Sequence, residues 1–123
     1  MVSQKEIDEI IEKIESDYSV DLEAGNYDKV AEYYHPDAAL VHAGNNGFVG
    51  RKAIGKTLAA FAQNDKNFKA TLVRNIIAGT DAEFVIHEGT YTSDSLKGKQ
   101  LPYRQIFKKE NGKYLIYHDE FTF

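Results

Sequence analysis

The chain ends in LPYRQIFKKENGKYLIYHDEFTF (residues 101–123), two extended runs joined by the short polar turn ENG. A turn of this length joins neighbouring strands antiparallel, because a parallel pair needs a crossover of a dozen or more residues. Two more extended runs precede it, FKATLVRNIIA (68–78) and AEFVIHEGTYTS (82–93), and short polar segments divide these as well. The C-terminal half is therefore predicted to be an antiparallel meander of four strands.

The N-terminal segment has a helical pattern instead. Its apolar residues recur every three or four positions, which is typical of an amphipathic helix. Ser3 and Glu6 have the spacing of a capping box and Gly25 is a stop signal, so we expect one long helix over residues 4–24. The stripe that this helix buries consists of Ile7, Ile10, Ile11, Ile14, Tyr18 and Leu22.

Shorter elements are expected between the long helix and the meander. Asn26 can cap a second helix through about residue 34, and Pro36 discourages its continuation. AALVHA (38–43) is predicted to be a strand, with GNNG (44–47) as its turn. A third helix is predicted from the spacing of Ala53, Ile54, Thr57, Leu58, Phe61 and Ala62.

The segment GRKAIGKT (50–57) fits the pattern of a nucleotide-binding phosphate loop, G-x-x-x-x-G-K-[ST]. Such a loop must be irregular and must follow a buried parallel strand. Here the residues between the two glycines share the helical stripe of the residues after Thr57, and the preceding NNGFV is short and polar. We therefore interpret the segment as the start of the third helix and not as a nucleotide site.

Composition limits the function classes. The chain of 123 residues is expected to be a single domain over residues 1–123. Its 15 basic and 19 acidic residues argue against a nucleic-acid partner, which needs clustered positive charge. The absence of Cys and of paired histidines predicts no metal and no cofactor. Neither a leader nor an apolar run of 18 residues is present, so we expect no membrane contact and a cytoplasmic location.

The segments YSVDLEAGNYDKVAEYYHPDAALVHAG (18–44), GFVGRKAIGKTL (47–58) and FKKENGKYLIYHDEF (107–121) together resemble the SnoaL-like branch of the nuclear transport factor two superfamily. The resemblance covers nearly the whole chain in the same order. It implies an α+β cone, in which a curved antiparallel sheet wraps a long N-terminal helix beside two short helices. The superfamily also includes ketosteroid isomerases and a kinase association domain, so the fold alone does not give the activity.

The register of the last hairpin decides which side chains face the inside of the cone. If ENG is a three-residue loop, residues 107, 105, 103 and 101 lie opposite 115, 117, 119 and 121; if only Asn111 and Gly112 form the loop, they meet the even-numbered residues. The first register collects the aromatic and aliphatic side chains on one face, so we prefer it. It predicts a concave wall of Tyr103, Gln105, Tyr117, Asp119 and Phe121.

Two further residues are predicted to contact a ligand. Phe61 lies on the apolar stripe of the third helix, and His87 alternates with Val85 and Gly89. His87 faces either the cavity or a dimer surface.

Similarity to ketosteroid isomerases implies roles for three residues. Tyr18 takes the place of an oxyanion-hole tyrosine, His42 that of the carboxylate base, and Gln105 that of a protonated acid. In one interpretation His42, steered by Asp119, removes a proton next to a carbonyl group while Tyr18 and Gln105 donate hydrogen bonds to the enolate. In the other, His42 is a hydrogen-bonded pocket residue and Asp119 is a structural carboxylate bonded to Tyr103 or Tyr18.

We therefore expect a pocket protein that binds a small apolar carbonyl or hydroxyl compound, with or without isomerase, cyclase or hydrolase chemistry. The alternative is a non-catalytic homodimeric assembly module. A homodimer is expected in either case, through a convex sheet face that carries Arg104, Ile106, Ile116 and His118.

Overall fold

The long first helix begins at the predicted residue and ends one residue before the predicted end. In the computed structural model, which describes residues 2–122, α1 spans Gln4–Glu23, and Ser3 and Glu6 form a complete capping box. Gly25 follows its end with a φ of +79°, a conformation in which a residue without Cβ is favoured. Met1 and Phe123, the two ends of the predicted domain, lie outside the described residues.

The second helix is shorter than predicted. α2 spans Tyr27–Ala31, and Tyr34 already begins the first strand, β1 (Tyr34–His42). Tyr34 pairs with Ile116 of the last strand, and the carbonyl of Tyr33 accepts a hydrogen bond of 2.9 Å from Ile116 N. This long-range pairing overrides the local helical pattern that extends to residue 34.

The third helix, α3, spans Arg51–Asn64, so the segment that fits the phosphate-loop pattern forms regular helical turns. Thr57 donates a hydrogen bond of 2.9 Å from its hydroxyl group to the carbonyl of Ala53 within the helix. The strand before α3 is β2 (Asn46–Val49), so residues 46 and 47 belong to a strand and not to the predicted turn. β2 is a short, mostly exposed edge strand, whereas a phosphate loop follows a buried one.

The sheet has six strands in the order β2-β1-β6-β5-β4-β3. The predicted meander is present as β3 (Lys69–Ala78), β4 (Phe84–Thr92), β5 (Leu101–Glu110) and β6 (Lys113–Phe121), with every neighbouring pair antiparallel. Short 3-10 turns at Thr80–Ala82 and Asp94–Leu96 lie within two of the connections. β1 pairs with β6 in parallel, which the predicted antiparallel sheet did not include. The long chain between β1 and β6 provides the crossover that a parallel pair requires.

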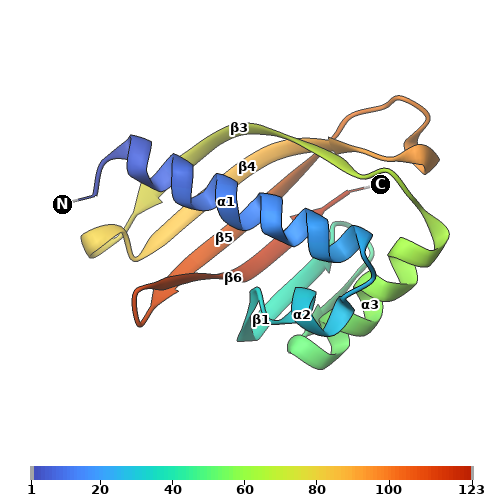
Figure 1. Ribbon diagram of the computed structural model, residues 1–123, viewed down its shortest axis with the longest axis horizontal. Helices are drawn as coiled ribbons and strands as arrows, with labels where there is room; N and C mark the ends of the chain where they lie inside the picture. Colours follow the sequence, from blue (N-terminus) through green and yellow to red (C-terminus); the bar gives the residue numbers. More distant parts are fainter. Residues whose placement is uncertain (1, 123) are drawn as a thin grey trace.

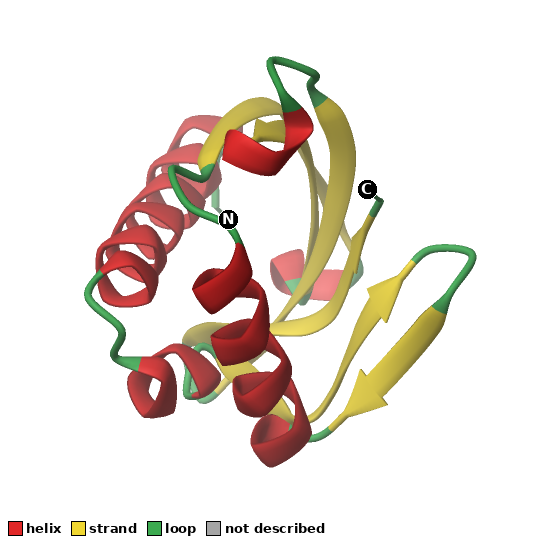
Figure 2. Ribbon diagram, turned by 90° about the vertical axis from the view of Figure 1, so that its right-hand side faces the viewer, coloured by secondary structure: helices red, strands yellow, loops and turns green. Residues whose placement is uncertain are grey.

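The helices lie on one side of the curved sheet. Figure 1 shows α1 running across β3 to β6, with α2 and α3 next to the end of the sheet that holds β1. Figure 2 shows α1 and α3 on the same side of the sheet. The fold is therefore the predicted α+β cone.

The core fills one end of this cone. Ile7 and Ile11 of α1 are fully buried and belong to the same core cluster as Val85, Phe107 and Ile116 of the sheet. Ile10, which the stripe also included, is 40% exposed. The first half of α1 therefore seals the sheet, and the second half faces the cavity described below. No helix among residues 2–122 is long and apolar enough to cross a membrane.

Candidate functional site

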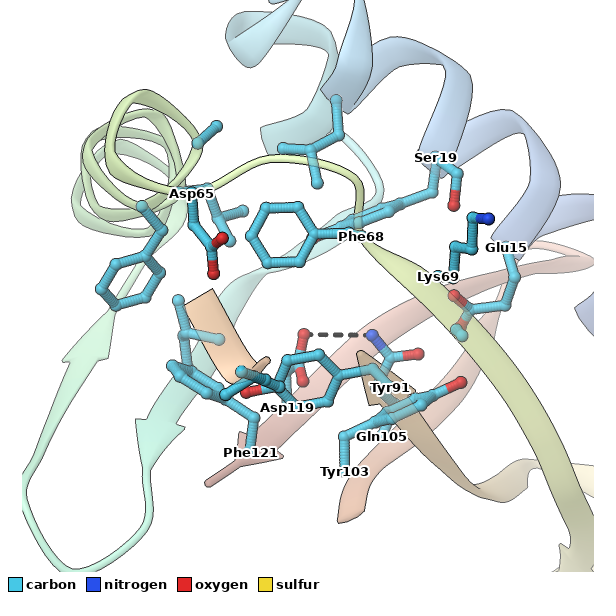
Figure 3. Close-up of a pocket in the computed structure, with 18 of the residues that line it drawn as sticks. Glu15, Ser19, Asp65, Phe68, Lys69, Tyr91, Tyr103, Gln105, Asp119 and Phe121 are labelled. Carbon is cyan, nitrogen blue, oxygen red and sulfur yellow. Dashed lines mark hydrogen bonds between the residues drawn. The ribbon is translucent and has the colours of Figure 1, made fainter. Parts of the chain in front are cut away.

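A cavity of about 600 Å³ lies between the second half of α1, the end of α3 with its following loop, and the concave face of the sheet. Its volume falls in the range of pockets that enclose small organic molecules. Figure 3 shows aromatic side chains around it and a few polar groups on its sheet side. The aromatic lining consists of Tyr18, Phe61, Phe68, Tyr91, Tyr103 and Phe121.

Two irregularities of the last hairpin set which side chains face this cavity. Asn111 and Gly112 both have positive φ, so the loop has two residues and Glu110 pairs with Lys113. The predicted three-residue loop is therefore wrong. A bulge then advances the pairing by one more residue, so that Phe107 pairs with Ile116 but Gln105 pairs with Asp119.

The two shifts add up to two residues, which restores the predicted alternation beyond the bulge. Four of the predicted wall residues consequently line the cavity, although the pairing from which they were predicted was wrong. They are Tyr103, Gln105, Asp119 and Phe121. Tyr117 is the residue that the bulge leaves out, and its predicted place in the concave wall is wrong. It is 37% exposed and contacts His35 and Lys108 instead.

Asp119 is the buried carboxyl group of the cavity wall. Its side chain accepts hydrogen bonds from the Tyr34 hydroxyl group at 2.7 Å and from Gln105 Nε2 at 3.0 Å, and both bonds end on Oδ2. The other carboxyl oxygen, Oδ1, is therefore available to a molecule in the cavity. Burial raises the pKa of Asp119 above its ordinary value, although the two hydrogen bonds act in the opposite direction.

Tyr18 is connected to Asp119 through Tyr34, which the sequence analysis did not assign to the site. The hydroxyl groups of Tyr18 and Tyr34 lie 2.8 Å apart. Because Tyr34 donates its proton to Asp119, the proton between the two hydroxyl groups must come from Tyr18. Tyr18 therefore lines the cavity, but its hydroxyl group already donates its hydrogen bond to Tyr34. It cannot also donate the predicted hydrogen bond to an enolate.

Glu15 is a site residue that the sequence analysis missed. It lines the cavity from α1, and its Oε1 is buried without a hydrogen-bond partner among the described residues. Burial and the charge of Asp119 raise the pKa of Glu15 to about 8. A sequence signal was present, since position 15 follows Ile11 by four residues and so falls on the inward face of the helix.

His87 lies behind the wall of the cavity and does not line it. Its Nδ1 lies 2.7 Å from Asn75 Oδ1, and its Nε2 lies 2.8 Å from the Tyr103 hydroxyl group. Asn75 Oδ1 can only accept, so Nδ1 carries the proton and Nε2 accepts from Tyr103. Burial lowers the pKa of His87 to about 4. Glu15 Oε1 is 3.6 Å from His87 Nε2, but with these pKa values the two groups are both neutral near pH 6 and form no ion pair.

His42 also lies outside the cavity lining. It ends β1, where it pairs with Phe121, and the two rings stack with their centroids 5.2 Å apart. Phe121 in turn packs edge-on against Phe61. His42 is thus placed behind an aromatic wall, while Leu40 of the same strand reaches the cavity.

The structure thus groups six of the nine predicted site residues in the cavity lining, namely Tyr18, Phe61, Tyr103, Gln105, Asp119 and Phe121. His42, His87 and Tyr117 lie elsewhere. Among residues 2–122, no three His, Asp or Glu side chains come close enough together to hold a metal ion.

Comparison with known proteins gives one family and a set of similar folds. The SnoaL-like domain family matches residues 17–116 of the chain. No curated protein matches the sequence.

Three solved structures share the fold at low identity. A Catenulispora acidiphila protein in complex with S-DNPA is 16% identical, with 97% of this chain and 94% of that chain covered and a TM-score of 0.75. A candidate scytalone dehydratase from Novosphingobium aromaticivorans is 19% identical, with 92% and 80% covered and a TM-score of 0.72. A candidate association domain of calcium/calmodulin-dependent protein kinase II from Xanthomonas campestris is 24% identical, with 91% and 84% covered and a TM-score of 0.70.

Proposed function

The chain belongs to the SnoaL-like domain family, and from this premise we propose that its cavity binds a small, largely apolar carbonyl or hydroxyl compound and that Asp119 accepts a proton from it. Binding of small molecules has support from one similar fold, since the Catenulispora acidiphila protein is in complex with S-DNPA. The proposed chemistry is removal of a proton from a carbon next to a carbonyl group. The C–H electron pair moves into the enolate, and the proton goes to Asp119 Oδ1.

The environment of Asp119 carries this proposal. One oxygen is held by Tyr34 and Gln105, which fixes the carboxyl group, while the other oxygen faces a cavity with aromatic walls. Burial raises the pKa of Asp119, which makes its carboxylate a stronger base than an exposed one. This arrangement replaces His42 as the proposed base, because His42 lies behind Phe121.

The test uses 2-tetralone, a small aromatic ketone with acidic protons beside its carbonyl group. We expect the protein to accelerate the incorporation of deuterium from D₂O at these carbons, measured by proton NMR. Asp119→Asn should slow the reaction at least about 100-fold, the lower range for a positioned general base. Asp37→Asn, a change at an exposed carboxylate of β1, serves as the matched control and should react like the unchanged protein.

Two results would count against the proposal. Equal rates of deuterium exchange with the Asp119→Asn variant and with the unchanged protein would show that Asp119 is not the base. Absence of any thermal stabilisation by 2-tetralone or similar aromatic compounds would contradict binding itself.

The alternative function, a homodimeric assembly module, was predicted to use four residues on the convex face of the sheet, and one of them does not lie on that face. Ile116 is fully buried in the core, because the bulge turns it away from the convex face. Arg104 is exposed, and Ile106 and His118 are half-buried on that face. Dimerisation through this surface stays a prediction that sedimentation at micromolar concentration tests.

A further inference from the structure

The hydroxyl groups of the three tyrosines that line the cavity all donate hydrogen bonds to other protein groups. Tyr18 donates to Tyr34, Tyr91 donates to the carbonyl of Thr122 at 2.6 Å, and Tyr103 donates to His87 Nε2. Gln105 uses one N–H to hold Asp119. A ligand oxygen that enters the cavity therefore finds no free tyrosine proton.

Glu15, whose side chain is 21% exposed, is a residue of the lining that can supply one. Its Oε1 is enclosed by protein without a donor, which leaves Oε2 for the cavity that Glu15 lines. Burying an ionised carboxylate with an enclosed, unpartnered oxygen costs several kcal/mol of folding free energy, whereas burying a neutral carboxylic acid costs far less. The neutral acid places its proton on the accessible Oε2, directed at the cavity. In Figure 3 Gln105 lies between Asp119 and Glu15.

We propose that Glu15, as a neutral carboxylic acid, donates a hydrogen bond to a carbonyl oxygen of the bound molecule while Asp119 faces the neighbouring carbon. Glu15 is then a catalytic residue of the proposed reaction and replaces Tyr18 in the predicted pair of enolate donors, Tyr18 and Gln105. The ligand class narrows from carbonyl or hydroxyl compounds to apolar ketones or aldehydes. This inference rests on the proposed function.

The charges around Glu15 agree with a neutral acid at physiological pH. His87 on β4 is neutral above pH 4 and supplies no positive charge, and burial raises the pKa of Tyr103 on β5, so its hydroxyl group is uncharged as well. Asp119 on β6 adds negative charge, which raises the pKa of Glu15 further. Lys69 of β3 also lines the cavity, but it is exposed and forms no ion pair with Glu15.

The experiment compares two planar probes of nearly equal shape, 2-acetonaphthone and 2-isopropenylnaphthalene, which differ in a C=O against a C=CH₂ group. At pH 6.5 we expect the ketone to bind about tenfold more tightly, as one buried hydrogen bond allows. Glu15→Leu should abolish this preference and leave the affinity for the alkene in place. Glu12→Leu, a change at an exposed glutamate of the same helix, is the matched control and should keep the preference.

The pH dependence of the ketone preference distinguishes a direct hydrogen bond from Glu15 from a general effect of the substitution on the fold. In the unchanged protein the preference for the ketone should fall as pH rises through 8, because Glu15 loses its proton and its carboxylate repels the carbonyl oxygen. In Glu15→Gln, whose amide N–H donates at every pH, a preference should remain and should not change between pH 6.5 and pH 9. This variant also decides the question if Glu15→Leu does not fold.

The outcomes distinguish this inference from the proposed function. Binding of neither probe would overturn both. Equal binding of both probes by the unchanged protein, or a pH dependence that survives in Glu15→Gln, would overturn the role of Glu15 and leave the cavity as a binding site.

Discussion

A single hydroxyl group, that of Tyr34, connects α1 to the carboxyl group of the cavity. It accepts a hydrogen bond from Tyr18 and donates one to Asp119, and its ring is fully buried. From the sequence, Tyr34 was expected at the end of the second helix and was given no role in the site. Its role follows only from the parallel pairing of β1 with β6, which no local pattern indicates.

Tyr34→Phe should destabilise the protein by about 1–3 kcal/mol, because it leaves the buried Tyr18 hydroxyl group without an acceptor and takes one donor from Asp119. The pKa of Asp119 should rise further, since the lost hydrogen bond lowers it. Urea unfolding measures the first effect, and carbon-13 NMR titration of the carboxyl group measures the second. Tyr117→Phe at an exposed ring is the control, and an equal loss of stability in both variants would contradict the prediction.

At the scale of elements, a glycine in β4 fixes the position of a ring from β5. A Cβ atom at Gly89 would lie 2.6 Å from the carbonyl oxygen of Thr71 and 2.8 Å from the Tyr103 ring and hydroxyl group. Tyr103 thus lies over the space that a side chain at position 89 would occupy. Its hydroxyl group reaches His87 on the same strand as Gly89.

Gly89→Ala should therefore push Tyr103 away from His87 and cost about 1–3 kcal/mol, the usual range for overpacking. The displaced ring moves within the wall of the cavity, so the affinity for 2-acetonaphthone should change as well. Thermal unfolding and probe titration are the measurements. Gly47→Ala in β2, where a Cβ would make only ordinary contacts of 3.6 Å or more, should change stability by less than about 0.5 kcal/mol. A variant of Gly89 as stable as that control would contradict the close contact.

At the scale of the whole molecule, Glu15 and His87 act on stability in opposite directions as pH changes. The folded-state pKa of Glu15 is raised from 4.5 to about 8, so its contribution to stability is lost as pH rises through that interval. The folded-state pKa of His87 is lowered from 6.5 to about 4, so its contribution is gained as pH rises from 4 to 6.5. Asp119, whose pKa is also raised, adds to the effect of Glu15.

The effects of Glu15 and His87 offset each other between about pH 4.5 and pH 6.5, and above that interval the effect of Glu15 is no longer offset by His87. We expect the free energy of unfolding to fall between pH 6.5 and pH 8, on the order of one to a few kcal/mol. Urea unfolding at intervals of half a pH unit measures it. Glu15→Gln should reduce the dependence of the unfolding free energy on pH between pH 6.5 and pH 8. An unchanged slope in that variant would show that the pKa of Glu15 is not raised.

Local sequence patterns determined the helix cap at Ser3, the end of α1 near Gly25 and the four-strand meander, and the resemblance to the SnoaL-like branch implied the cone. These features depend on neighbouring residues, whose hydrogen bonds and side-chain periodicity the sequence contains. The inward alternation of Gln105 and Asp119 was also correct, because the two errors in register add up to two residues.

The tertiary structure alone decided the loop length and bulge that turn Tyr117 outward, the parallel pairing that brings Tyr34 to Asp119, and the burial that raises the pKa of Glu15. Each of these depends on contacts between residues far apart in the chain. A pKa or a register shift is set by the atoms that surround a group in space, and a linear pattern does not specify which atoms those are.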